Sequence, residues 1–145
     1  MFLHRPIADL IARIKNGYRS RQLFVDYRIS KDALTFLSIL KDQGFIDFFT
    51  TSLPAEEKVS KHTGRIYLKY SGHPWKSYKD PALKKIHYVK KNSQISLKLS
   101  ELEDYEILRK RKKMEILVLL TPKGMLDHLS AIHQRVGGTL FCILR

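Results

Sequence analysis

Apolar residues recur at helical spacing over the first twenty positions of the chain. The residues that share one face are Ile7, Leu10, Ile11, Ile14 and Tyr18. Intervals of three and four residues are typical of an amphipathic helix whose apolar stripe faces a core. Pro6 suits the first turn of this helix. Asp9 and Arg13 stand four residues apart, so we expect them to pair on its surface.

The period then shortens to two residues. The segment Leu23–Ile29 alternates between apolar and polar positions. This alternation predicts a half-buried strand with Leu23, Val25, Tyr27 and Ile29 on its inner face.

A second helix is predicted directly after this strand. Ser30 is expected to cap it, because a serine oxygen accepts hydrogen bonds from the unpaired N–H groups of a first helical turn. Gly44 stands where a glycine commonly follows the last helical residue. The predicted inner face of the helix consists of Ala33, Leu34, Leu37 and Leu40.

The remaining segments predict more strands than helices. Strands are expected at residues 45–50, 65–70, 86–89, 95–99, 116–120 and 139–144. The charged stretch 101–113 is interpreted as a connection that is helical in part. Residues 125–134 predict a short helix with Leu126, Leu129 and Ile132 inward.

Residues that break regular structure predict two domains. Gly72, Pro74 and Pro81 interrupt the middle of the chain. We therefore expect an α+β fold whose N-terminal domain, residues 1–72, has the order α-β-α-β-β. It would pack on a mostly β C-terminal domain, residues 73–145, with one short helix.

The net positive charge of the chain indicates which class of molecule it binds. The chain has 27 Lys and Arg residues against 14 Asp and Glu residues, a formal net charge of +13. Such an excess attracts polyanions, so nucleic acid and an anionic membrane surface are the candidate partners, beside a basic protein with neither. The spread of basic residues over mixed elements disfavours the membrane. Residues 73–145 hold 15 basic and 7 acidic groups, against 12 and 7 in residues 1–72, which favours the second domain as the site.

The chain shows none of the usual targeting segments. No apolar run approaches the roughly 18 residues of a membrane-spanning helix. The first residues have the pattern neither of a secretory signal nor of a mitochondrial presequence. We therefore expect no membrane partner and no leader peptide.

Candidate catalytic and metal-ligating residues are scarce. His128 and His133 are five residues apart and fall on different helix faces, so no metal site is expected. Cys142 lies in an apolar strand and is interpreted as a small hydrophobic residue, not a nucleophile. The acidic residues within 101–106 stand beside the basic run 109–113, and pairing in solvent is expected. We expect no enzyme, no cofactor and no small-molecule substrate.

Aromatic and basic residues are interleaved between Trp75 and Lys91. Rings in such a stretch can stack on exposed bases while ammonium groups meet phosphates. The candidate RNA contacts here are Lys84, Lys85, Tyr88 and Lys90. The alternative, in which the rings belong to the core and the lysines form a solvated face, stays open.

The turn Thr121–Gly124 is a candidate phosphate site. It follows a buried strand and precedes the predicted short helix, so its backbone N–H groups would stand at a helix N-terminus. Lys123 adds a positive charge and Thr121 a hydroxyl group. The spacing of a Walker loop is missing, and an ordinary capped turn is the alternative interpretation.

Several blocks of the chain, taken in order, resemble the bacterial-type small-subunit ribosomal protein number eight family. The blocks are residues 6–17, 30–31, 40–46, 68–70, 121–124 and 137–138, followed by Cys142. The order and spacing of the blocks make the resemblance specific; it extends over most of the chain, and only residues 73–115 fit poorly. The resemblance implies a two-domain protein that binds the central domain of small-subunit ribosomal RNA, supports its assembly and contacts neighbouring small-subunit proteins.

The resemblance also implies which residues contact RNA. Primary contacts would come from the C-terminal domain, at Thr121, Lys123, Gly124, Gly137, Gly138 and Thr139. Further contacts would come from the first helix and the following cap, at Asp9, Arg13, Lys15, Asn16, Ser30 and Lys31.

The chain departs from the family pattern inside these blocks. Leu120 and Pro122 stand where the family has serines, and Thr139 stands where it has glutamate. Lysines would compensate for the lost hydroxyl contacts through phosphates. The divergence favours an organellar ribosome, and we expect an organelle-encoded mitochondrial protein, with a plastid stroma or a bacterial cytoplasm as alternatives. A free RNA-binding regulator of translation is the alternative function.

Overall fold

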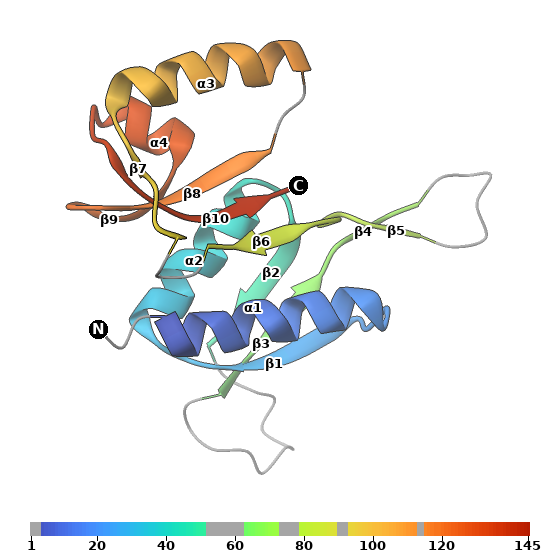
Figure 1. Ribbon diagram of the computed structural model, residues 1–145. Helices are drawn as coiled ribbons and strands as arrows, with labels where there is room; N and C mark the ends of the chain where they lie inside the picture. The colour runs from blue at the N-terminus through green and yellow to red at the C-terminus, as the bar shows by residue number, and fades with distance from the viewer. Residues whose placement is uncertain (1–3, 52–62, 73–78, 90–92, 113–114) are drawn as a thin grey trace. The chain divides into compact units, whose positions relative to one another are not determined.

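The computed structural model describes residues 4–51, 63–72, 79–89, 93–112 and 115–145, and its chain forms two compact units (Figure 1). The first unit is Met1–Lys84 and the second is Lys85–Arg145. The predicted boundary, between residues 72 and 73, precedes this division. Both units contain helices and strands, which confirms the α+β fold class.

The first unit is organised around a three-stranded antiparallel sheet. Its elements are α1 (His4–Arg19), β1 (Phe24–Arg28), α2 (Lys31–Asp42), β2 (Ile46–Thr50), β3 (Thr63–Leu68), β4 (Tyr70–Ser71) and β5 (Asp80–Pro81). β3 lies between β1 and β2, and the short strands β4 and β5 pair with each other. The order is the predicted α-β-α-β-β, extended by the β4–β5 pair.

The predicted apolar stripe of α1 is part of the core. All five of its residues are buried, from Ile7 to Tyr18. The Tyr18 hydroxyl donates to the Phe45 carbonyl and accepts from the Lys69 N–H, which ties the end of α1 to the segments beside β2 and β3. Burial raises the pKa of Tyr18 to about 12, so this hydroxyl keeps its proton near neutral pH.

Ser30 caps the second helix, as predicted. Its Oγ accepts from the Ala33 N–H at 3.1 Å. Gly44 follows the helix with a φ of +75°, a left-handed conformation that favours glycine. The buried residues of α2 are Ala33, Phe36, Leu37, Ile39 and Leu40, whereas Leu34, predicted to face inward, is half-buried.

The prediction that Leu23 faces inward is wrong. Leu23 is 75% exposed, while Val25 and Tyr27 in the same alternating segment are buried. Leu23 precedes the first residue of β1 and lines a surface groove. The alternation therefore describes the strand itself but not the residue before it.

The second unit is built around its last strand. Its elements are β6 (Ile86–Tyr88), β7 (Ser96–Leu97), α3 (Leu99–Lys112), β8 (Ile116–Thr121), β9 (Gly124–Asp127), α4 (His128–His133) and β10 (Gly138–Leu144). β10 pairs antiparallel with β8 along one edge and with β6 and β7 along the other. β9 completes the sheet beside β8.

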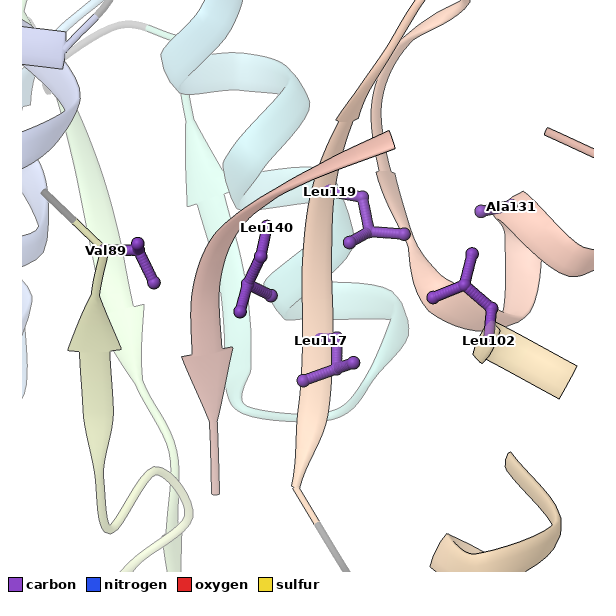
Figure 2. Close-up of a cluster of buried hydrophobic side chains, with 6 residues drawn as sticks. All are labelled: Val89, Leu102, Leu117, Leu119, Ala131 and Leu140. Atoms are coloured by element: carbon purple, nitrogen blue, oxygen red, sulfur yellow. The ribbon is translucent and has the colours of Figure 1, made fainter. Parts of the chain in front are cut away.

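Figure 2 shows the hydrophobic cluster at the core of this unit. Its members are Val89, Leu102, Leu117, Leu119, Ala131 and Leu140. Leu102 comes from α3 and Ala131 from α4, so both helices contribute to the core beside the sheet. The first four residues of β8 are all buried, which confirms the predicted buried strand. The pairing of β10 with β8 shifts register between Leu140 and Cys142, and Phe141 between them is buried together with both neighbours.

The charged stretch 101–113 is more regular than predicted. Residues 99–112 form the 14-residue helix α3, which Leu102 anchors with an exposure of 0%. The second unit therefore has two helices and not a single short one. No helix within the described segments is both long enough and apolar enough to cross a membrane.

The predicted helix over residues 125–134 is also wrong in part. Gly124 has a φ of +109°, which lets the chain reverse directly after β8. Met125 and Leu126 consequently pair with β8 as strand β9, and the helix begins only at His128. The inner face of α4 is therefore His128 and Ala131, while Leu126 and Ile132 are partly buried and Leu129 is 36% exposed.

Gly64 in β3 has no room for a side chain. A methyl group there would overlap the Thr50 carbonyl oxygen and lie 2.6 Å from Cε1 of Tyr27. We therefore expect Gly64→Ala to lower the free energy of unfolding by about 2 kcal/mol or more in urea denaturation. Gly72→Ala is the matched control, because a methyl group at Gly72 meets nothing within 4 Å. Equal stability of the two variants would contradict this packing.

Candidate nucleic-acid interface

The turn between β8 and β9 is held by the Thr121 side chain. Its hydroxyl donates to the Gly124 carbonyl at 2.8 Å and accepts from the Lys123 N–H at 3.2 Å. Lys123 is exposed, and its ammonium group lies 3.4 Å from the Gln134 carbonyl at the end of α4. Thr121 and Gly124 thus shape the turn, and Lys123 places a positive charge on it.

The prediction that this turn stands at a helix N-terminus is wrong. Strand β9 separates it from α4, because the chain pairs with β8 before it becomes helical. Helix N–H groups therefore do not face the turn. An anion bound here would depend on the ammonium group of Lys123 instead.

The predicted residues of the last strand lie beside this turn. Thr139 is opposite Leu120 on β8, and Gly138 is opposite Leu97 on β7. A methyl group on Gly138 would lie 2.6 Å from the Leu120 carbonyl oxygen and 2.9 Å from Cγ2 of Thr121. Gly138 therefore lets β10 pass close to β8, because it has no side chain.

Gly137 has the same role one residue earlier. A methyl group on it would lie 2.6 Å from the Leu97 carbonyl oxygen. The structure thus brings the six residues that the resemblance assigns as primary contacts to one end of the sheet. They are Thr121, Lys123, Gly124, Gly137, Gly138 and Thr139.

An open groove of about 630 Å³ lies at this end of the sheet. It is lined by residues 96–99, Leu120, Pro122 and residues 137–139. The sequence predicted a strand over residues 95–99 but did not place it at this site, because its pairing with the start of β10 has no local signal. Lys98 is the basic side chain that this segment adds, and it is exposed. The groove combines a main-chain floor with lysines near it, an arrangement that suits a phosphate backbone.

The candidates Lys84, Lys85 and Tyr88 lie elsewhere. The backbone of Lys85 pairs with that of Arg145 at 2.8 and 2.9 Å, just beyond the far end of β10. At a rise of about 3.3 Å per strand residue, Arg145 and its partner Lys85 lie about 20 Å along β10 from Thr139. Tyr88 lies opposite Cys142, and Lys84 ends the first unit. Lys90, Trp75 and Lys91 lie outside the described residues.

The candidates of the first unit lie on α1 and at the start of α2. Asp9 and Arg13 form the predicted ion pair at 2.9 Å, with both side chains more than half exposed. Asn16 follows Arg13 by three residues and shares its face, whereas Lys15 is turned by about 200° from Arg13. The Ser30 oxygen is engaged in the helix cap, and Lys31 is exposed in the first turn.

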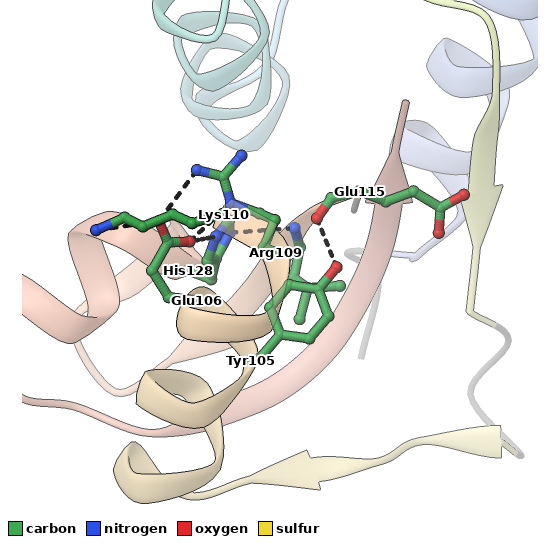
Figure 3. A network of polar contacts seen from close by, with 7 residues as sticks. Tyr105, Glu106, Arg109, Lys110, Glu115 and His128 are labelled. Carbon is green, nitrogen blue, oxygen red and sulfur yellow. Dashed lines mark hydrogen bonds and ion pairs between the residues drawn. The ribbon is translucent and has the colours of Figure 1, made fainter. Parts of the chain in front are cut away.

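A network of polar side chains in the second unit was not expected (Figure 3). Glu106 accepts from Arg109 at 2.7 and 3.1 Å and lies 2.9 Å from Nε2 of His128. The Leu117 N–H donates to Nδ1 of His128, so the ring proton lies on Nε2 and is donated to Glu106. The expected pairing of Glu106 with the basic run is confirmed by Arg109, but the expectation that the pair is solvated is wrong, since only 8% of Glu106 is exposed.

These contacts join α3, α4 and β8. The hydrogen bonds from Arg109, the largest cause, and from His128 lower the pKa of Glu106 to about 2, against the opposing effect of burial. Tyr105 adds a hydrogen bond from its hydroxyl to the Glu115 carbonyl at 2.6 Å, one residue before β8. With His128 fully buried, the network is inaccessible to a substrate and stabilises the unit.

Cys142 is a buried free cysteine, as interpreted from the sequence. Burial raises the pKa of its thiol well above the ordinary value, so the reactive thiolate is not populated near neutral pH. No group of three or more potential ligands for a metal ion occurs in the described part of the chain.

Fold and composition together define a basic α+β protein built from two units. The chain belongs to the ribosomal protein S8 family, whose model matches residues 5–144. This finding confirms the resemblance noted in the sequence. It also confirms that the chain is not an enzyme, because the proteins of this family are ribosomal components without enzymatic activity.

Bacterial relatives match along nearly the whole chain. The small ribosomal subunit protein uS8 of Legionella pneumophila (strain Paris) is 32% identical over 98% of this chain and 98% of its own length. The protein of the same name from Chlamydia caviae is 31% identical over 95% of this chain and 94% of its own. That of Protochlamydia amoebophila is 28% identical over 99% of both.

Loss of the Glu106 carboxylate is expected to destabilise the second unit. Glu106→Ala would leave His128 and Arg109 without their acceptor, so we expect the free energy of unfolding to fall by about 2–4 kcal/mol at pH 7. Glu103→Ala is the matched control, because Glu103 is exposed on the same helix, and its effect should stay within about 0.5 kcal/mol.

The pH dependence of this difference provides a second readout. A carboxylate with a lowered pKa stabilises the folded state above its ordinary pKa of 4.5 and loses this effect as the pH falls towards about 2. The stability difference between the unmodified protein and Glu106→Ala should therefore shrink between pH 4.5 and pH 2. A difference that stays constant in urea titrations over this range would contradict the assigned network.

Proposed function

We propose that this protein is a structural constituent of the small ribosomal subunit. In this role it binds the central domain of the small-subunit ribosomal RNA, supports the assembly of that RNA and contacts neighbouring small-subunit proteins. Membership of the ribosomal protein S8 family supports the ribosomal part of the proposal. The observation that carries the proposed site is the groove at the start of β10, where segments 96–99, 120–124 and 137–139 converge.

Charge neutralisation is the proposed source of affinity. Lys98 and Lys123 would contact phosphates and release the counterions that surround RNA. The formal net charge of +13 would raise the rate of encounter over the whole surface. Affinity that depends on phosphates in this way falls steeply as salt concentration rises.

The shape of the groove is proposed to fix the position of the bound RNA chain along it. Gly137 and Gly138 carry no side chain and line the groove, so a ribose-phosphate chain is proposed to approach the main chain there. The hydroxyl of Thr121 is already engaged within the turn, so we assign Thr121 and Gly124 a positioning role for Lys123. Thr139, on the groove wall, is the proposed polar contact of the last strand.

Other basic groups are proposed as secondary contacts. Lys15, Asn16 and Lys31 are exposed on the first unit and are proposed to meet further RNA. Lys84, Lys85 and Tyr88 would meet a separate RNA segment, since Lys85 lies at the other end of β10 from the groove.

Co-sedimentation tests the ribosomal role. We expect the endogenous chain to travel with the small ribosomal subunit in a sucrose gradient and to leave it when the subunit is unfolded by removal of magnesium. Recovery only in light fractions, bound to messenger RNA, would contradict this role and favour a free translational regulator.

We further propose that the ribosome in question is mitochondrial. The support is the divergence of the signature positions, Leu120, Pro122 and Thr139, from the pattern that the sequence otherwise resembles. A tagged chain should localise to the mitochondrial matrix. Localisation to the cytosol would contradict the mitochondrial assignment, and localisation to a plastid stroma would replace it.

Lys123→Gln should weaken RNA binding and its salt dependence together. Loss of one phosphate contact to duplex RNA should lower the slope of log affinity against log salt concentration by about 0.9. Lys41→Gln, an exposed lysine in the last turn of α2, is the matched control for the loss of one charge. Filter binding from low to high salt measures both slopes, and identical slopes for the two variants would contradict the proposed contact.

A further inference from the structure

The outer edge of β1 is open. β1 borders its three-stranded sheet and pairs with β3 alone among the described strands. The Leu68 N–H donates to the Leu23 carbonyl at 2.9 Å, which marks a hydrogen-bonded pair. Such pairs alternate with non-bonded pairs in an antiparallel ladder. The N–H and C=O groups of Phe24, Asp26 and Arg28 therefore point away from β3.

A groove runs along this edge, between β1 and α1. One hollow of about 430 Å³ is lined by Arg13 and residues 22–26. A second, of about 510 Å³, is lined by residues 27–30 of the β1 side and by Pro6, Asp9, Leu10 and Arg13 of α1. Arg13 lines both hollows, so they adjoin and together follow β1 from end to end. Figure 1 shows α1 running alongside β1.

The β1 side of this groove exposes apolar surface. Leu23 is 75% exposed and Phe24 is 41% exposed. The Phe24 ring also begins a row of aromatic rings across the outer face of the sheet. The centroid of the Phe24 ring lies 6.3 Å from that of Tyr67, and the Tyr67 ring stacks on Phe48 with their centroids 4.2 Å apart. Exposed apolar side chains beside an unpaired strand edge are typical of a site of association.

The charge of the groove is uneven. Asp9 is paired with Arg13, and Asp26 is paired with Arg65 at 2.8 Å. Within the residues that the structure describes, Arg28 has no acidic partner. The uncompensated charge along the groove is therefore positive, and it complements an acidic side chain.

We propose that an extended segment of a neighbouring small-subunit protein binds in this groove as a fourth strand beside β1. Its main chain pairs with Phe24, Asp26 and Arg28, its apolar side chains cover Leu23 and Phe24, and an acidic side chain meets Arg28. This proposal rests on the proposed assembly into the small subunit. It names the place and the chemistry of one protein contact there.

An RNA backbone fits this edge less well than a peptide. Phosphate oxygens only accept hydrogen bonds and the ribose 2′-hydroxyl is the one donor of the RNA backbone, so an RNA strand does not present the regular donor and acceptor pairs that match the β1 edge. A peptide strand supplies donors and acceptors in the alternation that the edge presents. Asp9, Arg13 and Ser30 line the same groove, so they contact the bound strand in place of RNA.

A photocrosslinking group at Leu23 tests the occupant directly. The full-length chain with benzoylphenylalanine in place of Leu23 is assembled into small subunits, purified by sedimentation and irradiated. We expect crosslinks to one extended segment of another ribosomal protein, with an acidic residue within it. Crosslinks to RNA only, to a second copy of this chain or to a helical segment overturn the proposal, as does the absence of any crosslink.

Two substitutions at Arg28 test the main-chain pairing. Arg28→Gln removes the charge alone, and we expect the crosslink yield to fall about twofold. Arg28→Pro removes the charge and the outward N–H, but spares the ladder to β3, so the yield should fall about fivefold further. Equal yields for the two variants overturn the proposed strand pairing.

The same preparation separates failure of this proposal from failure of the proposed function. A chain that is absent from the sedimented subunit contradicts the ribosomal role. A chain that is present there but crosslinks to no protein contradicts the groove proposal alone. The identity of the crosslinked segment is read without any change at Arg28, so this result does not depend on how Arg28→Pro folds.

Discussion

The second unit depends on the pairing of β10 with strands on both of its edges. β8 lies along one edge, and β6 and β7 share the other. Strands that flank β10 this closely leave no room for side chains where it begins, and Gly137 and Gly138 meet that constraint. The same two glycines line the groove beside the β8–β9 turn. The packing of the sheet and the lining of the groove therefore depend on the same residues.

A second constraint holds the helices to this sheet. Glu106 is acceptor to both Arg109 and His128, and His128 in turn accepts from the backbone of β8. A buried carboxylate is stable in a folded protein when such partners satisfy it. The network thus keeps α3 and α4 beside the strand that leads into the turn. Its position explains why a stretch that looks merely charged in sequence is an ordered helix.

The sequence predicted the first unit better than the second. The stripe from Ile7 to Tyr18 and the Ser30 cap depend on neighbours a few residues away, and both were confirmed. The helix predicted from Met125 failed because Gly124 turns the chain back onto β8, a partner that local periodicity does not register. Glu106 and His128 are 22 residues apart in sequence, so their contact had no local signal.

The candidate site likewise divides into residues that the sequence indicated and residues that only the folded sheet reveals. Thr121 to Gly124 and Gly137 to Thr139 came from the resemblance, and their proximity follows from strand pairing. Residues 96–99 were predicted as a strand but not as part of the site, because the pairing of β7 with the start of β10 has no local signal. Leu23 and Phe24 read as strand residues, and only the sheet order shows that β1 is an edge. Edges and grooves are properties of the assembled sheet.

The two units present different chemistry to a ribosome. The groove of the second unit has lysines and bare main chain, which suit phosphates, and the edge of β1 has apolar side chains and unpaired main-chain groups, which suit a peptide. Binding of RNA at the start of β10 can be measured by ultraviolet crosslinking of RNA to the protein in intact small subunits, followed by peptide mapping. We expect crosslinked peptides that contain residues 121–125 and 137–139. Crosslinks confined to the first unit or to α3 would contradict RNA binding at this groove.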